Sequence, residues 1–591
     1  MAKSILASRK PERTFEGLAA APGIAFGRAH VRIGGIADVE NYTVAKSKIP
    51  AELRRFDVAV RLARRQIKVL RDSADKMGRT GGREILFLFD AYLAMLDNSR
   101  LVRGSRDAIE ADRLNAEAAV QHQYTEIARQ FSQIEDTYIA ARIDDIREVA
   151  SRLIGILTRQ PDRVQFTVPA GSVLVASEIS PADMAQIDPE NVRAVVAALG
   201  GVEGHTAIMA RAQGLPAVLG VHGLIGAIET GSEIIVDGSQ GIVIVDPLPD
   251  TVKLYEKQRT QVRRRAKALD RLRDKPAVTL DGVGVNLLAN VELPVEMDLM
   301  HQSGARGIGL LRSEFMFMNR EDIPSEDEQV NTLKQIMSTV GNDPVTIRTL
   351  DIGGEKPAAA LMQDLDEGAA SALGLRGIRL SLANPDILKT QFRAILRAAQ
   401  GRNVRILLPM VSTVSEVRRA RRILSDAATS LRRAKVKVKE PLPPLGAMIE
   451  IPAAALAADA LAQTCDFFAI GSNDLTMYTL AVDRANEHVA ALYTGLHPAV
   501  LRLIQFSTEA ALRARIPVSI CGEMAGDPRL TALLVGLGLR DLSMSAANVP
   551  LVKQRILKLD TLAARNRALQ IMEQTDLGRI AALIDDFNGL A

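Results

Sequence analysis

In the second half of this 591-residue chain, polar side chains recur directly after short apolar runs. If those runs are parallel strands of a barrel, their carboxyl ends meet on one face and the side chains converge there. Guanidinium groups bind phosphate and carboxylate through paired hydrogen bonds, and carboxylate oxygens are ligands that Mg²⁺ takes. The set therefore predicts a site for a small phosphorylated acid together with Mg²⁺. Its members are Arg312, Arg348, Glu450, Asn473, Asp474, Arg484 and Cys521.

A histidine in the first half has a different setting. His205 follows a glycine-rich turn and directly precedes the helical pattern TAIMARAQG. The start of a helix offers free backbone N–H groups and a positive dipole end, which favour an anion there, and a neutral imidazole can attack phosphorus. The alternative is a helix-capping or core histidine. The paired glycines before His205 and Arg211 after it favour phosphorylation of the histidine.

These side chains need elements that hold them in place. In the second half about eight strand-like runs alternate with helical patterns, which is typical of a (β/α)8 TIM barrel. The first half combines the short strands of a small α/β domain with an all-helical insert, in which one helix is expected over 106–133. The predicted boundaries are 1–14 for an N-terminal extension, 15–49 with 159–247 for the α/β domain, 50–158 for the helical domain, 248–276 for a helical linker and 277–591 for the barrel.

Composition excludes several classes of protein. Hydrophobic residues make up 47% and charged residues 24%, the balance of a folded globular chain. A net charge of +4 over this length and an aromatic content of 4% without Trp argue against nucleic acid. Two cysteines exclude a disulfide framework and favour a reducing compartment. Since no apolar run reaches the roughly 18 residues that cross a bilayer, we expect a cytoplasmic protein without membrane insertion.

Several longer motifs resemble one known family. HTAIMAR, GIGLLRSEFMF, TIRTLDIGGEK, LRGIRLSL, MIEIPAAA, AIGSNDLTMYTLAVDR and CGEMAGD are similar to motifs of enzyme I of the bacterial phosphoenolpyruvate-dependent phosphotransferase system, and the likeness runs from about Phe15 to the C-terminus. The resemblance implies a swivelling phosphohistidine domain with an inserted helical domain that binds the carrier. A linker and a barrel that binds phosphoenolpyruvate and forms a homodimer would follow.

Residue by residue, the resemblance also implies roles. His205 matches the phosphorylated histidine, Cys521 the proton donor to the enolate carbon, and Glu450 and Asp474 the Mg²⁺ ligands. The implied reaction moves the phosphoryl group of phosphoenolpyruvate to the histidine and then to an HPr-like histidine phosphocarrier protein, with release of pyruvate, as the first step of the phosphotransferase system. The residues that match phosphoenolpyruvate contacts are Arg312, Arg348, Arg376, Asn473 and Arg484.

The sequence departs from the family pattern before the histidine, at Glu203 and Gly204, and at Tyr92, where sugar-branch members have His. These departures leave open a nitrogen-branch enzyme with an NPr-type carrier and, less favoured, a catalytically weakened regulatory protein. Phosphoenolpyruvate synthase and pyruvate-phosphate dikinase share the histidine and barrel motifs. They need an ATP-binding domain of a few hundred residues, however, and only a helical segment without a glycine-rich phosphate loop precedes His205 here.

Overall fold

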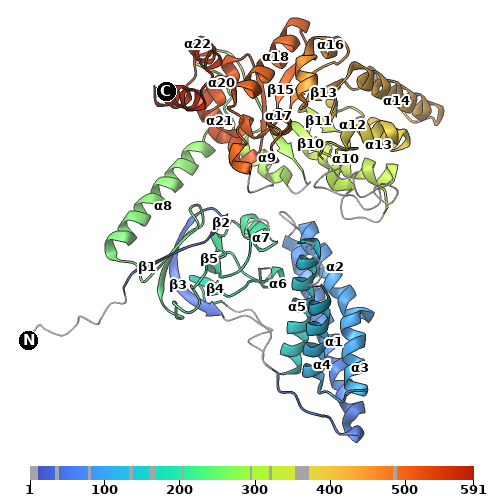
Figure 1. Ribbon diagram of the computed structural model, residues 1–591, viewed down its shortest axis with the longest axis vertical. Helices are drawn as coiled ribbons and strands as arrows, with labels where there is room; N and C mark the ends of the chain where they lie inside the picture. The colour runs from blue at the N-terminus through green and yellow to red at the C-terminus, as the bar shows by residue number, and fades with distance from the viewer. Residues whose placement is uncertain are drawn as a thin grey trace, which may run out of the picture. The chain divides into compact units, whose positions relative to one another are not determined.

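The structure is a computed structural model (Figure 1). It describes residues 11–32, 39–77, 82–131, 137–158, 168–184, 186–201, 205–292, 296–317, 322–352, 372–483 and 489–590. The chain forms two compact units, Met1–Arg263 and Arg264–Ala591. Among the residues so described, no helix has both the length and the apolar character that crossing a membrane requires.

The first unit contains an eight-stranded mixed sheet of order β1-β8-β7-β3-β4-β5-β6-β2. Neighbouring strands are parallel from β3 to β6, and the other pairings are antiparallel. The Val-rich runs of β4 and β5 are buried on both faces, as is typical of parallel strands. This sheet confirms the predicted α/β fold. Its strands are β1 (Arg13–Glu16), β2 (Leu18–Ala21), β3 (Ile24–Arg32), β4 (Ser172–Ala176), β5 (Val192–Ala197), β6 (Ala217–Leu219), β7 (Glu233–Asp237) and β8 (Ile242–Val245).

The helical segment of the first unit lies in the sequence between β3 and β4. A single helix over 106–133 was expected there, and that prediction is wrong. Arg113 has a φ of 57° in the left-handed region, and the side chain of Asn115 accepts from the backbone N–H of Tyr42 at 3.0 Å, so the chain turns between two helices. The helices are α1 (Ile49–Met77), α2 (Gly82–Asn98), α3 (Arg100–Glu110), α4 (Ala116–Phe131) and α5 (Thr137–Leu157).

Three further helices belong to the sheet or follow it. α6 (Pro181–Met184) and α7 (His205–Gln213) connect the parallel strands β4, β5 and β6. α8 (Pro249–Asp270) follows β8 and buries Tyr255 against Ile235 and Ile244. The side chains of α8 are otherwise mostly exposed, as expected for a charged helix with a thin apolar stripe.

The second unit is a closed barrel of eight parallel strands, which confirms the predicted TIM barrel (Figure 1). Some side chains of the barrel strands, including Leu310 and Met448, form a separate interior cluster together with Cys521. Other side chains of the barrel strands pack in a second cluster with side chains of the surrounding helices. The strands are β9 (Asn286–Val291), β10 (Ile308–Arg312), β11 (Val345–Arg348), β12 (Val404–Leu408), β13 (Leu445–Ile449), β14 (Phe468–Ile470), β15 (Val518–Ile520) and β16 (Asp541–Met544).

Helices follow the barrel strands along the chain. Several begin with clear start signals, such as the Ser325 capping box of α10 and the prolines at the start of α13 and α18. The helices are α9 (Met297–Ser303), α10 (Glu326–Val340), α12 (Gly377–Ala383), α13 (Pro385–Ala398), α14 (Val414–Arg433), α15 (Pro452–Leu456), α16 (Ala458–Ala462), α17 (Ser472–Leu480), α18 (Pro498–Ala514), α19 (Glu523–Gly526), α20 (Thr531–Gly536), α21 (Val549–Ile556), α22 (Thr561–Met572) and α23 (Leu577–Leu590).

A glycine inside the barrel wall tests how tightly the strands pack. A Cβ atom at Gly309 in β10 would lie 2.3 Å from Ser543 Oγ and 2.9 Å from Leu288 Cβ. We therefore expect Gly309→Ala to lower the free energy of unfolding of the barrel by about 1–3 kcal/mol, the usual effect of overpacking. Gly284→Ala is the matched control, because no atom lies within 4 Å of its Cβ position. Equal denaturant midpoints for the two variants would contradict this packing.

Candidate functional site

Most of the predicted polar side chains lie at the carboxyl ends of the barrel strands. Arg312 and Arg348 are the last residues of β10 and β11, and Glu450 and Cys521 directly follow β13 and β15. Asp474 lies in the first turn of α17, after β14. Because all eight strands are parallel, these positions share one face of the barrel, the face where active sites of this fold form.

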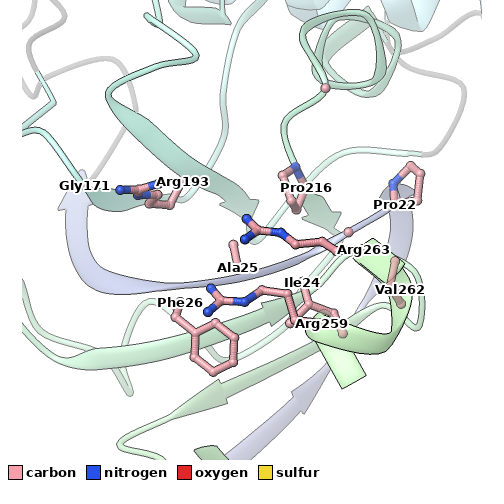
Figure 2. Close-up of a pocket in the computed structure, with 12 residues that line it drawn as sticks. Pro22, Ile24, Ala25, Phe26, Gly171, Arg193, Pro216, Arg259, Val262 and Arg263 are labelled. Atoms are coloured by element: carbon pink, nitrogen blue, oxygen red, sulfur yellow. The ribbon is translucent and has the colours of Figure 1, made fainter. Parts of the chain in front are cut away.

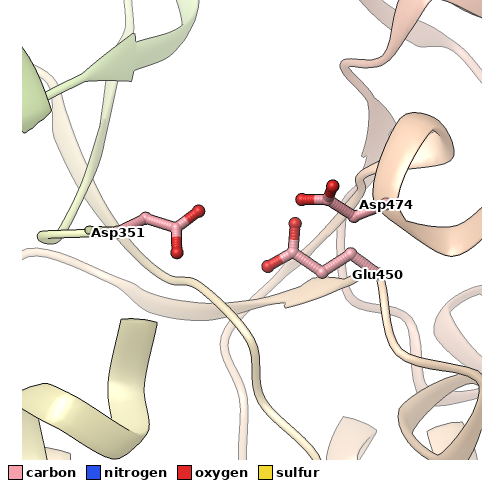
Figure 3. Close-up of side chains that lie close together, drawn as sticks. All are labelled: Asp351, Glu450 and Asp474. Atoms are coloured by element: carbon pink, nitrogen blue, oxygen red, sulfur yellow. The ribbon is translucent and has the colours of Figure 1, made fainter. Parts of the chain in front are cut away.

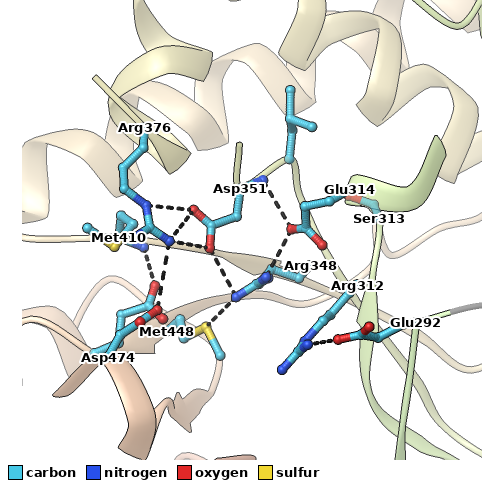
Figure 4. A network of polar contacts seen from close by, with 12 residues as sticks. Glu292, Arg312, Ser313, Glu314, Arg348, Asp351, Arg376, Met410, Met448 and Asp474 are labelled. Carbon is cyan, nitrogen blue, oxygen red and sulfur yellow. Dashed lines mark hydrogen bonds and ion pairs between the residues drawn. The ribbon is translucent and has the colours of Figure 1, made fainter. Parts of the chain in front are cut away.

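Two arginines and their carboxylate partners form a buried network on this face (Figure 4). Arg348 donates to Glu314 Oε1 at 3.0 Å and contacts Asp351 Oδ2 at 3.1 Å. Arg376, the residue before α12, donates to both oxygens of Asp351 at 3.1 and 3.2 Å and lies 3.8 Å from Asp474 Oδ2. The network thus joins side chains from β11 and from the starts of α12 and α17.

The electrostatics of the two arginines follow from this packing. Burial by itself would lower the pKa of the Arg348 guanidinium, but the negative charges of Glu314 and Asp351 outweigh that effect and its pKa is raised. The pKa of Arg376 is raised by the same balance, with Asp351 as the main opposing charge. Both side chains therefore stay charged and present fixed cations to an anionic ligand.

Three carboxylates converge beside the arginines (Figure 3). Asp351, Glu450 and Asp474 each offer an oxygen, and these oxygens lie within 4.8 Å of one another. Burial, followed by the negative charges of Asp474 and Asp351, raises the pKa of Glu450 to about 8. Such a cluster of hard oxygen donors fits a divalent cation, which would relieve the repulsion. Glu450 and Asp474 were predicted as ligands, whereas Asp351 was not.

Cys521 lies in the barrel interior and is only 3% exposed. Its Sγ lies 3.6 Å from the carbonyl oxygen of Ile470, and its own carbonyl accepts from Asn290 Nδ2 at 2.9 Å. Ser543 in turn donates to Asn290 Oδ1 at 2.6 Å. Burial, followed by the charge of Glu450, raises the pKa of Cys521 to about 12. The thiol therefore keeps its proton at neutral pH.

Arg312 and Asn473 have other partners. Arg312 forms an ion pair with Glu292, and burial followed by the charge of Arg348 lowers its pKa. The Asn473 side chain donates to Glu523 Oε1 at 3.0 Å and accepts from the Glu523 backbone N–H at 2.8 Å. A Cβ atom at Gly522 would lie 2.9 Å from Asn473 Oδ1, so the amide is next to the residue that follows Cys521.

Two buried residues that the sequence did not single out hold the strand ends together. Glu314 accepts from the Asp351 backbone N–H at 3.1 Å as well as from Arg348. Gln391, on α13, donates to Ser313 Oγ at 3.0 Å and accepts from the Leu350 backbone N–H at 2.9 Å. Glu314 and Asp351 follow strand ends by two and three positions, so the rule that selected Arg312 and Arg348 could have found them. Gln391 carries no such signal.

The remaining predicted residues lie elsewhere. His205 is in the first unit, where it is the first residue of α7, and the next residue, Thr206, donates to the carbonyl oxygen of Ile179 at 2.7 Å. Arg484 lies outside the described residues, as do Glu203 and Gly204.

Comparison with known proteins shows the family of the chain. Three segments match PEP-utilising enzymes: 16–142 the N-terminal part, 168–241 the mobile domain and 266–561 the PEP-binding domain. The chain is 40% identical over 551 residues to the phosphoenolpyruvate-protein phosphotransferase of Cupriavidus necator, covering 92% of this chain and 93% of that protein. It is 37% identical over 567 residues to that of Geobacillus stearothermophilus, covering 95% of each. A solution NMR structure of an Enzyme I protein is 28% identical and covers 42% of this chain and 99% of its own, with a TM-score of 0.36.

The barrel, the mobile domain and the helical segment together define a PEP-utilising enzyme. Within that class, the chain belongs to the family of phosphoenolpyruvate-protein phosphotransferases, the enzyme I proteins of the phosphotransferase system. The family inferred from the sequence motifs is thereby confirmed.

The raised pKa of Glu450 makes cation binding depend on pH. Below about pH 8 this carboxyl group holds a proton that a metal ion must displace. The affinity for Mg²⁺, measured by calorimetry, should therefore rise by up to about tenfold per pH unit between pH 6.5 and 7.5 and level off above pH 8. Glu450→Gln should bind Mg²⁺ more weakly and with a flatter pH profile. Equal affinity of the wild type at pH 6.5 and 8.5 would contradict this assignment.

Proposed function

We propose that the barrel site binds phosphoenolpyruvate with Mg²⁺ and that its phosphoryl group passes to His205, then to a histidine phosphocarrier protein. The observation that supports this most directly is the meeting of Arg348 and Arg376 with the three carboxylates at the barrel face. Phosphoenolpyruvate carries a phosphate and a carboxylate, and guanidinium groups bind both. Both relatives described above are named phosphoenolpyruvate-protein phosphotransferase.

Each predicted residue has a place in this proposal. Arg348 and Arg376 orient the substrate, with Arg312, Asn473 and Arg484 as further contacts. Asp351 joins Glu450 and Asp474 as an oxygen donor for Mg²⁺, which supplies positive charge for the phosphate oxygens when bound. The protein positions the reactants and neutralises charge, and these two effects account for most of the catalysis of phosphoryl transfer.

A ring nitrogen of His205 forms a bond to phosphorus while the bond from phosphorus to the enolate oxygen breaks. The enolate carbon takes a proton from the Cys521 thiol, which gives pyruvate, and solvent returns the proton to sulfur. The high pKa of Cys521 keeps that proton available. Because His205 must serve the barrel and afterwards the carrier, turnover requires a domain movement.

Partner and location remain predictions. An HPr-like carrier, bound by the helical domain over 50–158, is the first choice, and an NPr-type carrier of a nitrogen branch is the alternative. Tyr92, the position where sugar-branch members have His, is buried in that domain and donates to Asp145 at 3.4 Å, so it does not present its ring to a partner. We also predict a homodimer formed through the barrel. A cytoplasmic location is consistent with the two buried free thiols.

The phosphorylated residue can be tested directly. Incubation of the protein with labelled phosphoenolpyruvate and Mg²⁺ should give an acid-labile, base-stable phosphoprotein, because a phosphoramidate forms on histidine. His205→Ala should lose the label by more than about a hundredfold, the size expected when a nucleophile is removed. His222→Ala, an exposed histidine of the same unit, is the control and should label normally. Full labelling of His205→Ala would place the phosphoryl group on another residue.

The role of Cys521 has its own test. Cys521→Ser should slow pyruvate formation on the order of 10²-fold or more, because a hydroxyl is a much weaker acid than a thiol. The affinity for phosphoenolpyruvate should stay within about twofold, since the thiol makes no charged contact. Cys465→Ser, the other buried thiol, is the matched control. If Cys521→Ser forms pyruvate at the wild-type rate, the proton comes from another group.

A further inference from the structure

The first unit has a pocket of about 650 Å³ at the edge of the sheet where the parallel strands begin (Figure 2). Gly171 precedes β4, Arg193 is the second residue of β5, and Pro216 precedes β6. Two residues of α8, Arg259 and Arg263, line the other side. The pocket therefore lies between the sheet and the helix that leads away from it.

Three guanidinium groups face this pocket. Figure 2 shows Arg259 and Arg263 extending their guanidinium groups into it from α8, and Arg193 facing it from β5. The Arg259 guanidinium also lies over the Phe26 ring, 4.5 Å from its centroid, which holds that side chain in place. Within the described part of the chain, none of the three has a carboxylate partner. Three cations near one another without a counter-charge favour an anion.

We propose that this pocket binds a small organic polyanion, a molecule with two or more phosphate or carboxylate groups. Guanidinium forks bind both groups through paired hydrogen bonds. The apolar side chains of Ile24 and Phe26, which share one face of β3, fit a short carbon skeleton. The volume is in the range of small-molecule sites, and the pocket is bounded on both sides, so a metabolite fits better than a macromolecule.

The pocket is separate from the phosphorylation site. Arg193 lies at the start of β5, whereas the chain leaves β5 at Ala197 and reaches His205 at the start of α7. Gly214, which follows α7, lines the pocket, so a helix of nine residues and about 13 Å separates it from His205. A polyanion bound by Arg193 of β5 and by the arginines of α8 would connect α8 to the sheet. Binding should therefore raise the thermal stability of the first unit.

The test measures, by titration calorimetry, the affinity of the full-length protein for two probes, inorganic pyrophosphate and citrate. The double variant Arg193→Gln/Arg263→Gln should weaken the affinity for the bound probe at least about tenfold, because two of three cations are lost. Arg265→Gln is the matched control: it is an exposed arginine of the same helix that does not line the pocket. Arg348→Gln removes binding of either probe to the barrel site and should leave pocket binding unchanged.

The outcomes are distinct. Selective loss in the double variant supports the proposal, and preference for pyrophosphate or for citrate identifies phosphate or carboxylate as the group recognised. Failure of the wild type to bind either probe would overturn the proposal. So would loss of all binding in Arg348→Gln, or equal weakening by Arg265→Gln, which would indicate diffuse attraction by a charged helix.

Discussion

The arrangement at the barrel face depends on an excess of buried negative charge. Arg348 and Arg376 lie among four carboxylates, Glu314, Asp351, Glu450 and Asp474, so two cations face four anions and full ionisation would leave a charge of −2. Burying unbalanced charge is costly, and the raised pKa of Glu450 is one response to it. A divalent cation is the other response, because it supplies the two missing positive charges. Because the site already carries excess negative charge, an anionic substrate would bind better when a metal ion binds with it than in the absence of the metal ion.

The barrel makes this concentration of charge tolerable because it fixes the charged groups on segments that follow several of its strands. Arg348 ends β11 and pairs with Glu314, which follows β10, and with Asp351 on its own segment. Arg376 reaches Asp351 from the start of α12. Gln391 reinforces the arrangement from outside the barrel, since one amide joins the segments after β10 and β11. The charges are therefore held in position before any ligand arrives, which is the condition under which electrostatic catalysis is effective.

Much of this could be predicted from the sequence because each barrel strand is a short apolar run that ends in a polar residue. Arg348, Glu450 and Asp474 were selected on that basis, and the structure places them together. Glu314 and Asp351 were missed although they follow strand ends by only two and three positions, so the same rule could have found them. Gln391 could not be found, since its role depends on which helix packs behind which strands. The break near Arg113 was missed for a similar reason: helical periodicity continues across it, and only the left-handed residue and the contacts of Asn115 reveal the turn.

The most direct test of this account is the coupling between metal and substrate at the barrel face. The affinity for phosphoenolpyruvate, measured by calorimetry at saturating Mg²⁺ and in the presence of a chelator, should differ by at least about tenfold in the wild type, equivalent to about 1.4 kcal/mol of coupling. In Glu450→Gln, which lacks one of the three converging carboxylates, the difference should fall to about twofold or less. If the wild type binds phosphoenolpyruvate equally well with and without Mg²⁺, the carboxylate cluster is not a metal site that serves the substrate, and the account is contradicted.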